Sequence, residues 1–217
     1  MSGAPLHRHR HRVLRASALV SERGPQPREG RAAGLWRPAE LAGRLCELAA
    51  DPHGAHLTLA CAMIRAYQHA AEPVAWVTTT RDTFFPPDVA RGGVDLAALP
   101  VVTVPDLHAV ASAADRLTRS GAFGLVVLEL GARLAIPAPF LGRLARLARR
   151  HDSALLCLTT PAPGATLGSL IALRGRAFRD AAPQAGCLRC GIHVSKDRQR
   201  GPGRALAASY RAPHGLC

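Results

Sequence analysis

Acidic residues are scarce in this chain: its 217 residues include 15 Asp and Glu but 28 Lys and Arg, which gives a formal net charge of +13. Long apolar runs are missing as well, since no stretch reaches the roughly 18 residues that a transmembrane helix needs. The first residues, Met1 to Arg15, lack the apolar segment of a signal peptide. We therefore expect a cytoplasmic protein that has no membrane partner.

Cysteine and aromatic residues are also few. Six cysteines in an intracellular chain do not predict a disulfide framework. The single CxxC pair, Cys187 and Cys190, does not predict a metal site, because structural zinc takes two such pairs or a well-spaced His pair. Aromatic residues make up only 4% of the chain, so we interpret the following as packing residues rather than platforms for nucleic-acid bases: Trp36, Trp76, Phe84 and Phe85.

The excess of basic residues favours phosphate backbones, other anionic partners or acidic protein surfaces. Arginine far outnumbers lysine, however, and the richness in Ala, Arg, Gly and Pro also fits a GC-rich coding sequence. The charge alone therefore leaves nucleic-acid contact open. Residues 1–34, which contain an alternating His/Arg run from His7 to Arg12, show no apolar periodicity and predict a disordered basic arm.

From residue 35 onward, short apolar strands alternate with helices of about a dozen residues, which predicts βαβ units and a mostly parallel sheet flanked by helices. The expected strands are Pro73–Thr78, Val101–Val104, Phe123–Leu128 and Ser153–Leu158. The expected helices are Ala55–His69, Leu107–Ser120 and a segment from Pro137 to Arg150. The fold class is thus α/β, with a core over residues 35–210 and a tail over 211–217.

Two segments of the core do not follow the simple alternation of strands and helices. Leu41, Leu45 and Leu48 recur at helical spacing, yet Gly43–Leu48 also alternates like a strand, and periodicity does not decide between them. Near the end of the chain, Cys187–Val194 and Arg204–Tyr210 alternate like an antiparallel hairpin, with Lys196–Gly203 as its loop. The hairpin would extend one edge of the sheet.

This order of elements resembles the ATPase core of RecA recombinases. It is more similar still to the ImuA group, small RecA-like proteins of bacterial mutagenesis cassettes that are encoded beside polymerase subunits. The likeness covers roughly residues 35–210. The segments that carry it are Gly43–Leu48, Pro73–Val77, Phe84–Asp88 with Gly93–Asp95, Arg119–Glu129 and Val194–Arg198.

The resemblance places a phosphate-binding loop at Asp51–Leu57, but the residues that such a loop needs are replaced. A P-loop uses backbone N–H groups, a Lys for the β and γ charges and a Ser or Thr hydroxyl for Mg²⁺. Gly54 is retained, whereas Ala55 stands in place of the Lys and His56 in place of the hydroxyl. Asp51 adds a negative charge. We therefore expect no tight binding of Mg-ATP.

Two carboxylate positions bear on the same site. The resemblance puts a catalytic carboxylate after the strand that ends at Thr78, where Arg81 stands, with Asp82 one residue away. The strand Leu125–Glu129 does end in a carboxylate, as metal-binding strands do. We call Gly54, Ala55, His56 and Glu129 the degenerate nucleotide site, and we predict no catalytic residue in it.

Basic residues near the hairpin are the remaining candidates. The resemblance matches Lys196 and Arg198 to a basic pair that RecA protomers use to reach a neighbour's nucleotide. It places a short counterpart of the DNA-binding loop at Gly164–Arg179. The basic residues of that segment would supply phosphate contacts whose strength falls with salt: Arg174, Arg176 and Arg179.

The resemblance implies a non-catalytic accessory factor of damage-induced translesion synthesis that binds error-prone polymerase subunits or RecA. One alternative is a DNA-binding protein that uses the basic arm and the Arg174–Arg179 segment, and its affinity would fall steeply with salt. Another is a residual ATPase that uses Glu129, which predicts thermal stabilisation by nucleotide.

Overall fold

The structure is a computed structural model, and it describes residues 35–50, 54–79, 86–132, 136–162, 164–181 and 187–211. Several sequence predictions concern residues outside this part of the chain. They are the basic arm over 1–34, the tail from residue 212, and the positions Asp51, Arg81, Asp82, Phe84 and Phe85.

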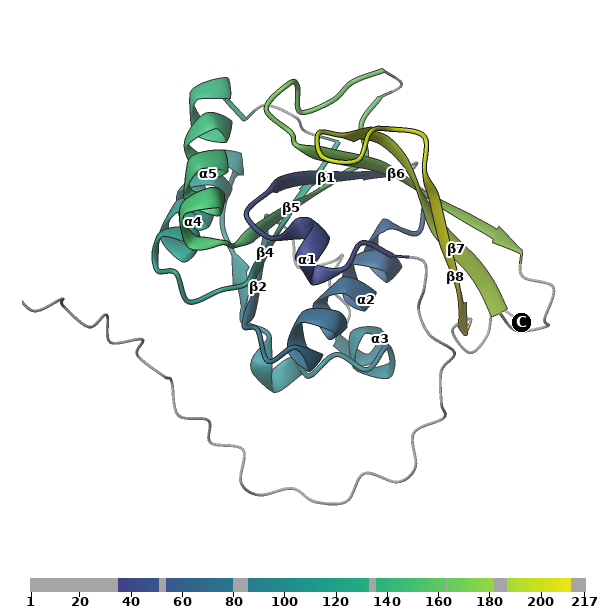
Figure 1. Cartoon of the computed structure of the whole chain (residues 1–217). Coiled ribbons are helices and arrows are strands. Elements are labelled where there is room, and N and C mark those ends of the chain that lie inside the picture. Colours follow the sequence, from purple (N-terminus) through teal and green to yellow (C-terminus); the bar gives the residue numbers. More distant parts are fainter. Residues whose placement is uncertain are drawn as a thin grey trace, which may run out of the picture. The chain divides into compact units, whose positions relative to one another are not determined.

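An eight-stranded sheet forms the centre of the fold, in the order β3-β2-β4-β5-β1-β6-β7-β8 (Figure 1). The strands that precede the final hairpin are β1 (Leu45–Ala50), β2 (Val74–Thr78), β3 (Val101–Thr103), β4 (Leu125–Gly131), β5 (Ala154–Thr159) and β6 (Leu173–Ala181). Every pairing among these six strands is parallel. The last two strands, β7 (Cys187–Asp197) and β8 (Ala205–Arg211), add an antiparallel hairpin to β6.

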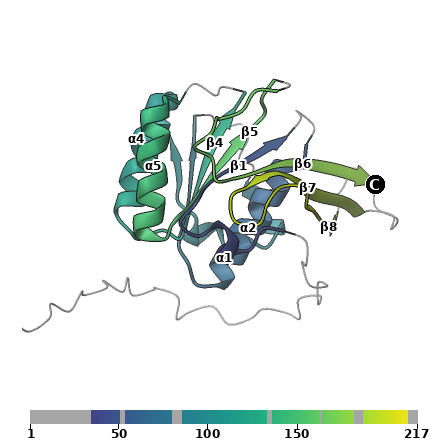
Figure 2. The same ribbon diagram turned by 45° about the horizontal axis from the view of Figure 1, so that its top comes forward.

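Helices cover both faces of the parallel sheet (Figure 2). The longer helices are α2 (His56–His69), α4 (Leu107–Arg119) and α5 (Ala138–His151). Short elements are α1 (Pro38–Leu41), α3 (Pro86–Arg91) and a 3-10 turn at Leu96–Ala98. Helix α2 packs on one face of the sheet, and α4 and α5 pack on the other. The connection from β1 to β2 through α2 moves along the sheet in one direction, and those from β3 to β4 and from β4 to β5 move in the other. Because parallel crossovers are right-handed, opposite directions place the helices on opposite faces.

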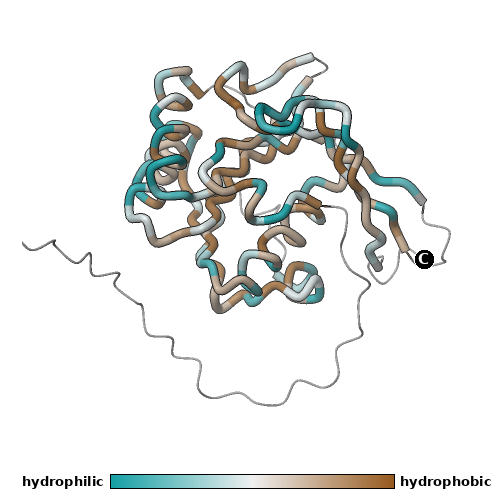
Figure 3. The backbone as a smooth tube through the Cα atoms, in the orientation of Figure 1, coloured by the Kyte–Doolittle hydropathy of each residue, from teal (hydrophilic) through white to brown (hydrophobic). Residues whose placement is uncertain are grey.

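The apolar runs of the sequence occupy the middle of the sheet (Figure 3). Strands β2 and β5 are buried at every position, as expected for parallel strands that are covered on both sides. Trp36 and Trp76 are each about 1% exposed, so the prediction that these two rings serve as packing residues is confirmed. Within the described residues, no helix is long and apolar enough to span a bilayer.

The alternating pattern predicted the α/β class correctly. The structure decides one alternative that the sequence left open, and one other segment differs from expectation. The ambiguous stretch Gly43–Leu48 contributes to strand β1, and only one helical turn, α1, precedes it. The segment Gly164–Arg179, matched to a loop, contains most of strand β6 instead. Strand β6 lacks the apolar run of the other parallel strands, because it contains a glycine and three arginines. It continues past its parallel neighbour β1, so fewer of its residues need to be apolar.

Helices α4 and α5 are joined by Asp115, whose carboxylate accepts hydrogen bonds from Arg119 of α4 and from Arg143 Nε of α5, the latter at 2.6 Å. Burial acts to raise the pKa of Asp115, but the hydrogen bonds and charges of the two arginines lower it overall. A carboxyl with a lowered pKa stabilises the fold above its ordinary pKa of about 3.9, and this contribution is lost as the pH falls through the folded value.

We therefore expect the thermal midpoint to fall steeply below about pH 4. Part of that slope should disappear in Asp115→Asn, which has no proton to take up. Calorimetry across an acid series would measure both slopes, and identical slopes would show that Asp115 does not contribute to acid unfolding.

Candidate functional site

The degenerate nucleotide site lies at the start of α2, a few residues after the carboxyl end of β1. Ala55 is the N-cap of α2 and is buried, and His56 is the first residue of the helix. Alanine has no side-chain oxygen to cap the helix, and no side-chain cap bond is formed at this end. The sequence spacing thus predicted the position of Gly54, Ala55 and His56 at a helix N-terminus, the place where anions bind in many α/β proteins.

His56 does not replace the missing cation. Burial lowers the pKa of this imidazole, although the nearby Glu129 carboxylate and the Gly54 backbone act in the opposite direction. Because an ordinary His pKa is about 6.5, the ring is neutral at pH 7. Its Nδ1 atom is buried and has no hydrogen-bond partner among the described residues. The side chain therefore fills the helix start without offering a charge.

Glu129 lies near the carboxyl end of β4 and is 8% exposed. The indole Nε1 of Trp76, on the neighbouring strand β2, donates a hydrogen bond of 3.1 Å to its carboxylate. Sequence reasoning placed Glu129 at a strand end, but it did not identify this buried partner. The carboxylate has a structural role in joining β2 to β4, whatever else it contacts.

Mg-ATP does not fit the described residues of this site. A nucleotide would need a cation for its β and γ phosphates and a hydroxyl for its metal, and Ala55 and neutral His56 supply neither. Glu129 is already engaged by Trp76 and adds negative charge close to His56.

A second cluster brings together three of the five predicted basic contacts. Arg174 Nη2 donates to the carbonyl of Gly168 at 2.9 Å, and Lys196 Nζ and Arg198 Nη2 donate to the carbonyl of Ser169 at 2.9 and 2.6 Å. The pKa of Lys196 is lowered chiefly by partial burial, and also by the positive charges of Arg198 and Arg174. The three cations therefore lie close together over the loop that leads into β6.

One carboxylate, Glu47 of β1, offsets this charge. It is fully buried, and it accepts a hydrogen bond of 2.6 Å from Arg174 Nε and a longer one of 3.3 Å from the Thr159 hydroxyl. The Leu167 backbone N–H lies 3.4 Å from both of its oxygens. The ion pair of Glu47 with Arg174 is thus part of the packed interior, a structural role that the prediction of Arg174 as a phosphate contact did not include.

The other two predicted contacts, Arg176 and Arg179, are exposed on β6. Side chains alternate along a strand, so Arg176 shares the face of Arg174, whereas Arg179 points to the opposite face. Lys196 was expected in the hairpin loop but lies within β7, which continues to Asp197. The five basic residues therefore form a three-residue cluster and two separate exposed positions.

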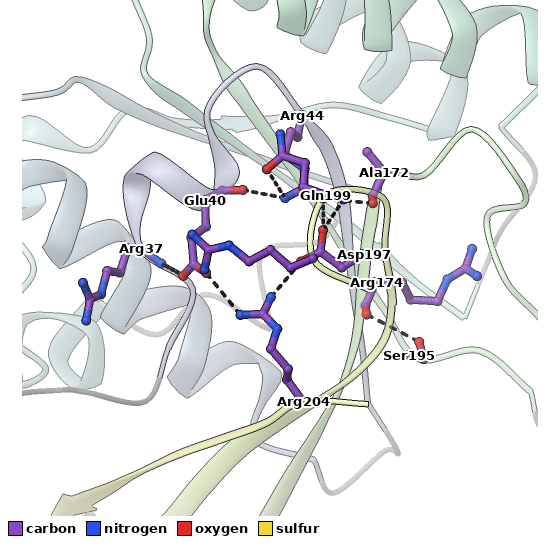
Figure 4. Close-up of polar contacts among 10 residues, drawn as sticks. Arg37, Glu40, Arg44, Ala172, Arg174, Ser195, Asp197, Gln199 and Arg204 are labelled. Carbon is purple, nitrogen blue, oxygen red and sulfur yellow. Dashed lines mark hydrogen bonds and ion pairs between the residues drawn. The ribbon is translucent and has the colours of Figure 1, made fainter. Parts of the chain in front are cut away.

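Sequence reasoning missed a buried ion-pair network that joins α1 and the start of β1 to the β7–β8 turn (Figure 4). Arg44 Nη2 donates to Asp197 Oδ1 at 2.7 Å and to the Ala172 carbonyl at 3.0 Å. Arg204 bridges Asp197 at 2.7 Å and Glu40 at 3.4 Å. The available signal was a charged residue, Arg44, directly before a strand that is apolar except for Glu47.

Comparison with known proteins adds no family to this picture. No protein-family model matches the chain, and a search of the curated proteins finds no match.

Proposed function

We propose that this chain is a RecA-like accessory protein that acts by binding other proteins of DNA repair and that does not hydrolyse ATP. The observation that carries the proposal is the helix start at Ala55 and His56, where a cation and a hydroxyl would be needed and neither is present. The packed parallel sheet around this start supports a retained fold without the nucleotide chemistry.

The partners we propose are an error-prone polymerase subunit or RecA, in translesion synthesis after DNA damage. Their identity follows from the sequence resemblance to the ImuA group. The net charge of +13 supports partners with acidic surfaces. We propose that the protein acts in the cytoplasm, with the nucleoid as a further location.

The first test is titration of the purified chain with a fluorescent ATP analogue and Mg²⁺, with an intact RecA as the positive control. We expect no saturable binding up to millimolar nucleotide. Two lost charge-assisted contacts of about 1.5–3 kcal/mol each weaken binding by roughly 10²- to 10⁴-fold. Saturable micromolar binding would overturn the proposal.

A residual ATPase makes a different prediction, which Glu129→Gln separates from the proposal. Under that alternative, nucleotide raises the thermal midpoint of the wild type and this effect is lost in the variant. Under the proposal, nucleotide shifts neither protein. Glutamine is the preferred replacement because its amide oxygen still accepts the hydrogen bond from Trp76.

Partner binding needs a direct measurement. The chain would be mixed with purified RecA or with a purified polymerase subunit and followed by size-exclusion chromatography at two salt concentrations. We expect co-elution with at least one of these proteins. Elution of every mixture as separate components would leave the accessory role without a partner and contradict it.

A second function, contact with nucleic acid, is favoured by the cluster of Arg174, Lys196 and Arg198, in which three cations face one buried carboxylate. We expect any such affinity to fall steeply with salt, because neutralised phosphates release counterions. Arg176→Ala should reduce the salt slope by about one unit if its guanidinium contacts one phosphate.

A further inference from the structure

The three antiparallel strands β6, β7 and β8 present one face to the core and one face outward. Cys190, Ile192 and Val194 of β7 are buried in the cluster that includes α2. Because side chains alternate, the residues between them point away from α2. We call this opposite surface the outer face, and it carries Arg176, Phe178 and Asp180 of β6, Arg189, Gly191 and His193 of β7, and Ala205 and Ala207 of β8.

A cavity of about 390 Å³ opens on the outer face. Its lining combines two rings, Phe178 and His193, with one carboxylate, Asp180, and one guanidinium, Arg189. The small side chains of Ala205 and Ala207 complete the lining from β8. None of these residues belongs to the degenerate nucleotide site or to the cluster of Arg174, Lys196 and Arg198.

The two rings are stacked. Their centroids are 4.4 Å apart and their planes differ by 29°. Gly191 makes this arrangement possible: a Cβ atom there would lie 2.4 Å from Phe178 Cζ and 2.3 Å from the Leu206 carbonyl oxygen. The absence of a side chain at residue 191 therefore lets the Phe178 ring lie flat over β7.

We propose that this cavity is a nucleobase-binding subsite, in which a purine or pyrimidine ring extends the stack of Phe178 and His193. Stacking on aromatic side chains accepts any base, because every base has a π face. Asp180 can accept from an exocyclic amino group, and Arg189 can donate to a ring nitrogen or carbonyl. The ring stack and the paired donor and acceptor favour a base over an acidic peptide, which would need only the positive charge.

The base can come from a free nucleotide or from a single strand. Positive charge on the same face favours the single strand, since Arg176 pairs in register with His193 and Arg189 lines the cavity. The inference rests on the second function, nucleic-acid contact, and is independent of protein partners. It assigns that contact to residues outside the Arg174–Arg179 segment as well as within it.

The test measures binding of a fluorescent oligothymidylate of about 15 nucleotides to the full chain by anisotropy. Phe178→Leu removes the ring but keeps an apolar side chain, and we expect about a tenfold loss of affinity, the effect of one stacked base. Phe178→Trp should retain wild-type affinity. The matched control is Phe140→Leu, because Phe140 of α5 also forms a ring pair with a histidine, an edge contact with His108 of α4.

Competition separates the sources of the base. Displacement by free thymidine monophosphate that depends on Phe178 would assign the site to nucleotides, and displacement by unlabelled strand alone would assign it to single strands. Either result supports the subsite. The contrary result is polyglutamate that competes as well as the strand at the same concentration of negative charge. That result would show that the protein recognises only negative charge, and it would overturn the nucleobase-binding subsite.

Photo-crosslinking of a 5-bromouracil strand to the wild type keeps the inference testable if the variants are unstable. We expect crosslinked peptides that contain Phe178 or His193. Wild-type affinity in Phe178→Leu, with crosslinks elsewhere, would overturn the subsite and leave nucleic-acid binding intact. No binding by the wild type would overturn both, and the proposed protein partners would be unaffected.

Discussion

Replacing Asp197 with alanine is expected to lower the free energy of unfolding by about 3–5 kcal/mol, because it leaves a buried guanidinium without its counter-charge. The side chains of Arg44 and Asp197 are 7% and 1% exposed and lie 2.7 Å apart. Asp197 also holds Arg204 and accepts from the Gln199 backbone N–H, so the substitution breaks several contacts at once. Burial acts to raise the pKa of Asp197, but the hydrogen bonds from the Gln199 backbone N–H and from Arg44, together with the Arg44 charge, lower it overall.

Urea unfolding at pH 7 measures this effect, and the chain contains a matched control. Asp88 pairs with Arg91 on α3 at 3.6 Å, but both side chains are more than half exposed. Exposed pairs contribute about 0–1 kcal/mol, so Asp88→Ala should shift the urea midpoint little. Equal midpoints for the two variants would mean that Arg44 finds another acceptor and that the network is not a source of stability.

The same network explains how the hairpin is held. Glu40 of α1 accepts from the Arg37 backbone N–H and binds Arg200 and Arg204 at the β7–β8 turn. The start of the core and its last hairpin are thus connected by charges more than 150 positions apart in the chain. A hairpin fixed at its turn can keep the outer face in one geometry, which a stacking site requires.

The layers of the fold could be predicted from the sequence because the central strands are short, continuous apolar runs and the helices between them have an apolar face with helical spacing. The period of α2 identified Ala55 and His56 as the helix start, and the structure confirms that position. The lowering of the His56 pKa could not be predicted, because it arises from burial in the folded protein. The bond from Trp76 to Glu129 joins residues on separate strands and has no local signal.

The cavity on the outer face also has no local signal in the sequence. Phe178 lies among arginines in a segment matched to a loop, and Gly191 gives no sign of the ring that it accommodates. Strand register brings Phe178 opposite Gly191. Only register, which depends on the whole sheet, turns these separate residues into one cavity.

Arg174→Ala is the second substitution with a large expected effect, and it changes how the basic segment must be tested. Glu47 depends on this partner, because its side chain is completely buried and its shortest hydrogen bond is the one of 2.6 Å from Arg174 Nε. Removing one partner of a buried ion pair destabilises a protein by about 3–5 kcal/mol. We therefore expect a large drop in the urea midpoint, whether or not Arg174 contacts DNA.

Two comparisons make this prediction specific. Adding Glu47→Gln to Arg174→Ala should recover part of the lost stability, because a neutral amide is less costly to bury than an unpaired carboxylate. Arg179→Ala, at an exposed position on the same strand, should change stability by less than about 0.5 kcal/mol. If Arg174→Ala proved as stable as Arg179→Ala, the ion pair would have no structural role. Loss of DNA binding in Arg174→Ala counts as evidence of contact only at temperatures where the variant is folded.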